Sequence, residues 1–290
     1  MKRLLGIVFI GVSLAFTLGF SARPEAQPEN TAKFMVGTWE KVQAEPADPG
    51  KPNQECVLKM ITPSHWMVLH IDLWTHKVKS AFGGPCSFGV GEYSEILEYA
   101  TAEAPEPDPA QKHTYKISKD GDRFFQSGRI GNFNVEETWK PAAPASKPAA
   151  APGSPPPQAQ PETTAKFMVG TWEKVPAKPA GPGNPNQERR LKMITPSHFM
   201  VMSIDTWTHK VRWAHGGPCS FGVGEYSEVI EYSLTGNPDP TKKWALKIRK
   251  DGDRFIQSFG KIGDNDEETW KPAAPATKPA AAPGSPAAER

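Results

Sequence analysis

The sequence predicts an all-β protein: two tandem antiparallel up-and-down barrels of about eight or nine strands each, joined by a Pro/Ala-rich linker. Three observations lead to this prediction. One long segment occurs twice, strand-forming stretches alternate with turn residues in each copy, and much of the proline lies between and after the copies. The length of 290 residues also fits two ordinary domains.

The first 22 residues are typical of a signal peptide. Two basic residues open the chain, an uncharged and mostly apolar run extends from Leu4 to Phe20, and the small residues Ser21 and Ala22 follow. An uncleaved anchor is the alternative, because a membrane-spanning helix needs about 17–25 residues. We expect cleavage after residues 1–22, an extracytoplasmic (periplasmic or secreted) protein, and no membrane contact apart from the export signal.

The repeated segment covers residues 29–140 and 162–271. The stretch KFMVGTWEKV begins at Lys33 and again at Lys166, and GGPCSFGVGEYSE recurs at the same offset of 133 residues. Solenoid repeats run about 20–50 residues, so a repeat of this length indicates duplicated domains.

Proline and alanine dominate the segments that follow each copy, at 141–161 and 272–290. The first contains eight prolines and almost no residue able to form a core. We expect it to be a solvated, semi-extended spacer and the second segment to be a disordered tail. A proline-rich binding motif is the alternative for both.

Neither copy has the charge of a nucleic-acid-binding domain. Residues 29–140 hold 12 Lys and Arg against 16 Asp and Glu, and residues 162–271 hold 16 against 14. A nucleic-acid-binding domain usually shows a strongly basic face. We therefore expect no nucleic-acid partner, and the sequence leaves the oligomeric state open.

Short segments rich in β-branched and aromatic residues fill each copy, with Gly, Pro, Asn or Asp between them. Turn signals at 62–64 and 119–122 predict tight hairpins. Closing such a meander into a barrel removes its exposed edges, whereas a two-sheet sandwich is the alternative. In the first copy the expected strands are 36–42, 55–62, 65–72, 77–82, 86–90, 93–99, 113–118, 123–130 and 135–140.

Three motifs resemble those of bacterial secreted lipocalin-like (calycin-type) domains. They are a Gly-Thr-Trp start, a Lys-x-Ile-Thr-Pro-x-His hairpin and a Tyr-x-Glu-x-Ile-x-Tyr strand. The matching segments are 37–39, Lys59–His65 and Tyr93–Tyr99 in the first copy, with Lys192–His198 and Tyr226–Tyr232 in the second. The resemblance covers about 110 residues of each copy and implies a barrel able to bind a small molecule, without an established ligand.

Tryptophan is expected to close one end of each barrel, through Trp39 and Trp172. Lipocalins usually stack an arginine from the end of the barrel on this tryptophan. Here Lys140 and Lys271 are the only basic residues near that place.

The candidate ligand-binding site centres on the strand 93–99. Strand alternation places Tyr93, Glu95 and Tyr99 on one face, and a carboxylate on an inward face needs a partner. The expected partners are His65 and Arg123. The alternative is a Glu95 that is solvated or paired for structural reasons. The equivalent residues of the second copy are Tyr226, Glu228, Tyr232, His198 and Arg254.

Histidine and cysteine patterns predict neither a metal site nor a cofactor, because the sequence has no CxxC or HExxH motif. A Cys56–Cys86 disulfide is favoured over a catalytic Cys86. Cys219 is expected to be free, because Arg189 occupies the position of Cys56 in the second copy.

These features together predict an exported, non-enzymatic binding protein in which each barrel holds a small hydrophobic or amphipathic ligand. Two alternatives remain. One is a structural or protein-interaction module with filled barrels, and the other is a hydrolase or isomerase that uses the Glu95 and Glu228 pockets.

Overall fold

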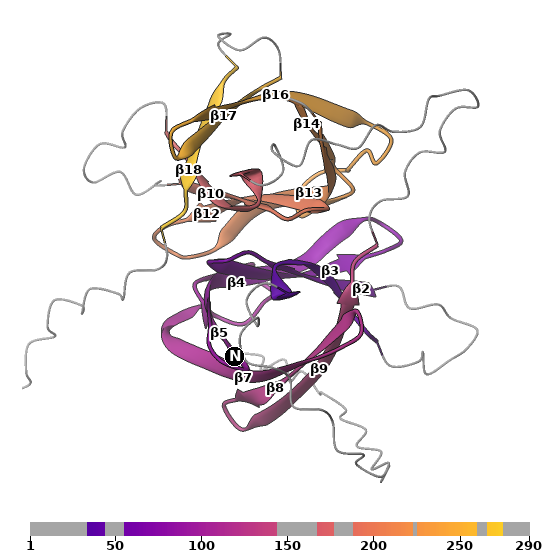
Figure 1. Cartoon of the computed structure of the whole chain (residues 1–290), viewed down its shortest axis with the longest axis vertical. Helices are drawn as coiled ribbons and strands as arrows, with labels where there is room; N and C mark the ends of the chain where they lie inside the picture. The colour runs from indigo at the N-terminus through magenta and orange to yellow at the C-terminus, as the bar shows by residue number, and fades with distance from the viewer. Residues whose placement is uncertain are drawn as a thin grey trace, which may run out of the picture.

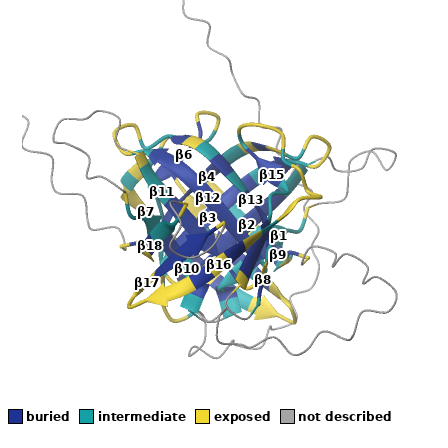
Figure 2. Cartoon of the chain, turned by 90° about the horizontal axis from the view of Figure 1, so that it is seen from above, coloured by how far each residue is buried: buried dark blue, intermediate teal, exposed yellow. Residues whose placement is uncertain are grey.

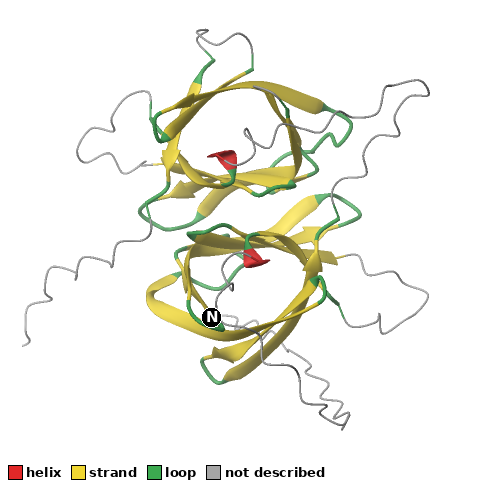
Figure 3. Ribbon diagram, in the orientation of Figure 1, coloured by secondary structure: helices red, strands yellow, loops and turns green. Residues whose placement is uncertain are grey.

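The computed structural model describes residues 34–43, 55–143, 167–176, 188–222, 225–259 and 266–274. The expected signal peptide, the linker beyond residue 143 and the tail beyond residue 274 lie outside these ranges. Within them the regular structure is β-strand, apart from helical residues at 34–35 and 167–168 (Figure 3). No helix in this part of the chain is long and apolar enough to cross a bilayer.

Strands between residues 37 and 141 form a closed antiparallel ring, called here the first ring (Figure 1). Consecutive strands pair from β1 to β5 and from β7 to β9, β5 pairs with β7, and β9 pairs with β1. The short β6 pairs with β4 beyond the end of β5. The strands are β1 (Gly37–Lys41), β2 (Glu55–Ile61), β3 (His65–Asp72), β4 (Lys77–Phe88), β5 (Glu92–Leu97), β6 (Tyr99–Ala100), β7 (Asp108–Asp120), β8 (Arg123–Ile130) and β9 (Phe133–Pro141).

A second ring, between residues 170 and 272, repeats the same order of pairings. It closes between β10 and β18, and β15 pairs with β13 as β6 does with β4. The prediction of an all-β chain with a closed antiparallel barrel is confirmed. The strands are β10 (Gly170–Lys174), β11 (Glu188–Ile194), β12 (His198–Asp205), β13 (Val211–Phe221), β14 (Glu225–Val229), β15 (Tyr232–Ser233), β16 (Lys243–Asp251), β17 (Arg254–Ser258) and β18 (Glu268–Pro272).

Several strand boundaries were predicted wrongly: the expected strand 113–118 is part of the longer β7, and the expected strand 93–99 divides into β5 and β6. The sequence Gly83-Gly84-Pro85 suggested a break between two strands, but β4 runs through it without interruption. A Cβ atom on Gly84 would lie 2.2 Å from the carbonyl oxygen of Ile96. The glycine is therefore required for close approach of the neighbouring chain, not for a turn.

Buried side chains lie on both faces of β2, β3 and β4. In β2, Val57 and Ile61 belong to the cluster inside the first ring, whereas Leu58 and Met60 belong to a different buried cluster. A strand of a lone barrel would instead alternate between buried and exposed residues. Figure 2 shows the resulting layer of buried strands, with exposed residues in the turns and in parts of the outer strands such as β8 and β17.

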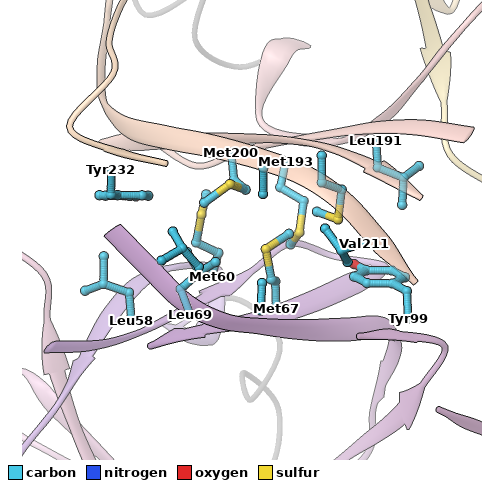
Figure 4. Close-up of a cluster of buried hydrophobic side chains, with 14 of the residues drawn as sticks. Leu58, Met60, Met67, Leu69, Tyr99, Leu191, Met193, Met200, Val211 and Tyr232 are labelled. Carbon is cyan, nitrogen blue, oxygen red and sulfur yellow. The ribbon is translucent and has the colours of Figure 1, made fainter. Parts of the chain in front are cut away.

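The outer faces of β2–β4 and β11–β13 pack against each other, and we call their shared contact the inter-ring cluster. Figure 4 shows side chains of the two rings pointing toward one another across this contact. Methionines contribute much of it, and their flexible thioethers fill irregular gaps. The cluster contains Leu58, Met60, Met67, Leu69, Ile71, Val78, Ala81, Tyr99, Ala142, Leu191, Met193, Met200, Met202, Ile204, Val211, Ala214, Tyr232 and Ala273.

Polar contacts across this face come in reciprocal pairs. The hydroxyls of Thr38 and Thr195 lie 2.8 Å apart, and those of Thr62 and Thr171 lie 2.7 Å apart. Each residue of the second pair is the repeat equivalent of one in the first, as in an isologous dimer interface. Two backbone hydrogen bonds have the same relation, from Ala100 N to His209 O at 3.1 Å and from Ser233 N to His76 O at 3.2 Å.

The cysteines are free, so the predicted Cys56–Cys86 disulfide is wrong. The reason is strand alternation: Cys56 packs against the inter-ring cluster outside the first ring, whereas Cys86 packs against the cluster inside it. Arg189, the repeat equivalent of Cys56, reaches across the interface and forms an ion pair with Glu98 at 2.9 Å.

Replacing Met60 by Ala is expected to destabilise the chain by about 2–5 kcal/mol, the usual cost of truncating a fully buried methionine. Met60 points out of the first ring and is 0% exposed only because the second ring covers it. Urea unfolding of the full chain measures the change. The matched control Val90→Ala, at a position 74% exposed, should stay within about 0.5 kcal/mol. Equal effects of the two substitutions would contradict the packing of the rings.

Candidate functional site

A cavity of about 290 Å³ lies inside the first ring. Its rim is formed by exposed residues, among them Pro105 and Glu106 between β6 and β7 and Asp108 at the start of β7. Its base is formed by buried residues, above all Lys59 and Trp139, which are each 1% exposed. The lining residues are Lys41, Val57, Lys59, Trp66, Val68, His70, Phe82, Glu95, Leu97, Pro105, Glu106, Asp108, Gln111, His113, Tyr115, Gln126, Ile130, Val135, Glu137 and Trp139.

A buried ion pair between Lys59 and Glu95 occupies the base of the cavity. Both side chains are almost fully removed from solvent. Burial raises the pKa of Glu95, and the attraction of the Lys59 ammonium opposes that rise. Each charge therefore depends on the other, since an unpaired charge at this depth would be very costly.

Further hydrogen bonds extend this pair into a chain of polar groups, called here the polar relay. The Lys59 ammonium donates to Gln126 Oε1 at 2.9 Å, and Gln126 Nε2 donates to Glu137 Oε2 at 2.7 Å. Lys41 Nζ then donates to Glu137 Oε1 at 2.7 Å. Two lysines thus face two glutamates, and the relay carries no net charge when all four groups are ionised.

Aromatic rings surround the Lys59 ammonium on several sides. Its nitrogen lies 5.5 Å from the Trp66 ring, 5.2 Å from Tyr93, 5.8 Å from Tyr115 and 5.4 Å from Trp139. Such rings attract a cation and exclude water from it. The buried indole Nε1 of Trp139 has no hydrogen-bond acceptor among the described residues, and the same holds for Trp270, its repeat equivalent.

The residues predicted for the site are only partly brought together. Glu95 lines the cavity, and Tyr93 lies in the cluster inside the first ring, where burial raises its pKa well above the ordinary value. Tyr99 lies in the inter-ring cluster instead. Leu97 still lines the cavity, so the alternation of inward and outward residues breaks at Glu98, between the end of β5 and the start of β6.

The predicted partners of Glu95 lie elsewhere, and its partner is Lys59. His65 is buried at the start of β3, where its Nδ1 lies 2.9 Å from the Ser64 hydroxyl. Burial, with a smaller contribution from Arg189, lowers the pKa of His65 to about 4. Arg123 is exposed at the first residue of β8.

Equivalent residues of the second ring repeat this arrangement. Glu228 forms an ion pair with Lys192, which donates to Gln257 at 2.7 Å. Tyr226 is buried inside the second ring, and Tyr232 lies in the inter-ring cluster. The two remaining predicted residues behave as their counterparts do: His198 is buried beside Ser197, and Arg254 is exposed.

Sequence reasoning missed Lys59, Gln126 and Glu137. A signal for Lys59 was present, because it is the only charged residue in the apolar run Cys56–Ile61 and shares the inward parity of Val57. Gln126 and Glu137 carried no comparable local signal, since only the register of β8 and β9 places them opposite each other.

The described residues contain no group of three or more His, Cys, Asp or Glu side chains arranged to hold a metal ion. No protein-family model matches the chain, and no curated protein matches it. Solved structures with weak similarity include the DNA polymerase III beta subunit of Thermotoga maritima, at 11% identity and a TM-score of 0.14. The DnaN sliding clamp of Bartonella birtlesii bound to griselimycin matches at 10% identity and a TM-score of 0.13.

These alignments cover 88% and 87% of this chain, which spans 60% of the length of each of those proteins. Similarity at this level supports no inference about the chain.

Replacing Lys59 by Met is expected to cost about 3–5 kcal/mol near neutral pH, because it leaves Glu95 buried without its counter-charge. The folded-state pKa of Glu95 is already raised, and it should rise further in the variant. A raised carboxyl pKa makes stability highest at low pH, and that stability is lost as pH rises through the folded-state value. Urea unfolding at about pH 5 and about pH 8 should therefore show the larger loss at the higher pH.

The double variant Lys59→Met with Glu95→Leu serves as the control, since it removes both charges and should recover most of the stability with little pH dependence. A single Lys59→Met variant that lost the same stability at both pH values would contradict the account of this pair.

Proposed function

We propose that this chain is an exported, non-enzymatic binding protein of two lipocalin-like up-and-down barrels, in which the first ring holds a small amphipathic molecule. The observation that carries the proposal is the cavity of about 290 Å³ inside the first ring. Small-molecule sites are typically concave, mostly apolar and provided with a few polar groups. Export and the two-barrel division rest on the sequence, through the segment 1–22 and the duplicated copies.

The lining favours a ligand with an apolar body and an uncharged hydrogen-bond acceptor. Val57, Val68 and Phe82 supply apolar walls, and Gln111 and His113 provide hydrogen-bonding groups in the lining. Because the charges of the polar relay compensate one another, a charged ligand head would be buried without a counter-charge. An alcohol, ketone or ester with a short hydrocarbon body satisfies both conditions.

Binding is favoured over catalysis by the state of Glu95. A general acid or base must exchange a proton with the substrate. Lys59 instead holds the Glu95 carboxylate in an ion pair, within a relay that connects to Gln126 and Glu137. The pair therefore suits a structural role at the base of a pocket.

A protein-interaction module with filled barrels is the second candidate. The specific observation in its favour is the polar relay, in which the carboxylates and ammonium groups find partners within the protein. Satisfied buried networks can serve only to rigidify a core. The two candidates differ in whether an apolar probe enters the first ring.

Titration of the full chain with the neutral fluorophore N-phenylnaphthylamine tests the binding proposal. Enhanced fluorescence that a medium-chain alkanol reverses is the expected result. Val68 lines the cavity and is 7% exposed, so Val68→Phe should fill space and weaken probe binding at least tenfold, which corresponds to about 1.4 kcal/mol. The control Val90→Phe, at an exposed turn, should bind as the unaltered chain does.

Circular dichroism and thermal unfolding establish that both variants are folded. An unaltered chain that leaves the probe in water would refute the binding proposal and favour the filled-barrel module. Equal binding by Val68→Phe and the unaltered chain would place the probe outside the first ring and also refute it.

A further inference from the structure

The interiors of the two rings differ along one row of inward-facing side chains. Strand pairing aligns the row across β2, β3 and β4 in the first ring, and across β11, β12 and β13 in the second. At one position of this row, Trp213 of the second ring replaces Ser80 of the first. The row reads Val57, His70 and Ser80 in the first ring, and Arg190, Ser203 and Trp213 in the second.

Trp213 lies in the middle of a stacked column inside the second ring. Its ring centroid is 5.3 Å from that of His215, with an angle of 8° between the planes. The Arg190 guanidinium lies 5.4 Å from the same indole and also donates from Nε to Glu188 Oε1 at 2.6 Å. Trp213 packs against the cluster of buried side chains inside this ring. The column is thus held by stacking, by an ion pair and by the core.

The corresponding region of the first ring is open. Val57, His70 and Phe82, the equivalents of Arg190, Ser203 and His215, line the cavity of about 290 Å³. Val57 is shorter than Arg190 and Ser80 is smaller than Trp213, whereas His70 is larger than Ser203. In the second ring the column therefore stands where Val57 and Phe82 line the cavity of the first ring. Beside it, Lys174, Pro176, Glu188 and Arg190 line a pocket of about 260 Å³.

We infer that only the first ring takes up the ligand, and that the column of Arg190, Trp213 and His215 closes the second ring to it. The chain then binds one ligand molecule, not two. The inference rests on the proposed binding function and extends it by naming which repeat binds and which residues prevent the other from binding. The second ring contributes by covering the outer face of β2–β4.

Stoichiometric titration with N-phenylnaphthylamine, at protein concentrations well above the dissociation constant, tests this on the full chain. The unaltered chain should bind one probe molecule. Val68→Phe should lose it, whereas the equivalent substitution in the second ring, Val201→Phe, should retain it. These two variants place the same side chain at the same position of the two rings.

Opening the second ring provides the converse test. The double variant Arg190→Val with Trp213→Ser introduces the first-ring residues at two positions of the row and should raise the stoichiometry to two. Trp207→Ser, at a turn where the indole is 83% exposed, is the matched control and should remain at one. Thermal unfolding verifies that each variant is folded, and the Val68 and Val201 variants decide the question if the double variant fails to fold.

Two probe molecules on the unaltered chain, or loss of binding in Val201→Phe, would overturn this inference and leave the binding proposal standing. A folded double variant that still binds one probe would also overturn it. A chain that binds no probe would refute the binding function itself, and this inference with it.

Discussion

The structure depends on one constraint, which is that β2–β4 and β11–β13 carry apolar side chains on both faces. The inner faces line the interiors of the two rings, and the outer faces would expose a large apolar surface if either ring stood alone. Residues such as Met60 and Met193 become fully buried only through contact between the rings. The reciprocal threonine pairs then fix the relative register of the rings. The two copies are therefore structurally interdependent.

A second constraint acts inside each ring, where a lysine is buried among aromatic side chains. Lys59 and Lys192 are 1% and 0% exposed, so each needs a carboxylate and further hydrogen bonds. The resulting relay places polar groups at the base of an otherwise apolar chamber. The two copies differ in the row of residues across β2–β4 and β11–β13, where Ser80 of the first ring corresponds to Trp213 of the second.

Much of the fold follows from local sequence. The duplication, the hairpin at Thr62-Pro63-Ser64 and the inward position of Glu95 were all predictable, because they depend on composition, turn chemistry and strand alternation. Contacts between residues that lie far apart in the sequence were not predictable. Lys59 reaches Gln126 across 67 positions of sequence, and the break between β5 and β6 at Glu98 sends Tyr99 to the other face. The inter-ring face did leave a signal, since apolar residues occupy successive positions of β2 and β3.

Native mass spectrometry of the protein purified from its own source, without denaturation, tests the central claim most directly. The account predicts a chain carrying one uncharged small molecule of defined mass, released when the protein is unfolded. The mass of the bare chain alone, together with no thermal stabilisation by short-chain alcohols, ketones or esters, would contradict it. That result would leave the two rings as a packed structural unit, with the polar relay serving stability only.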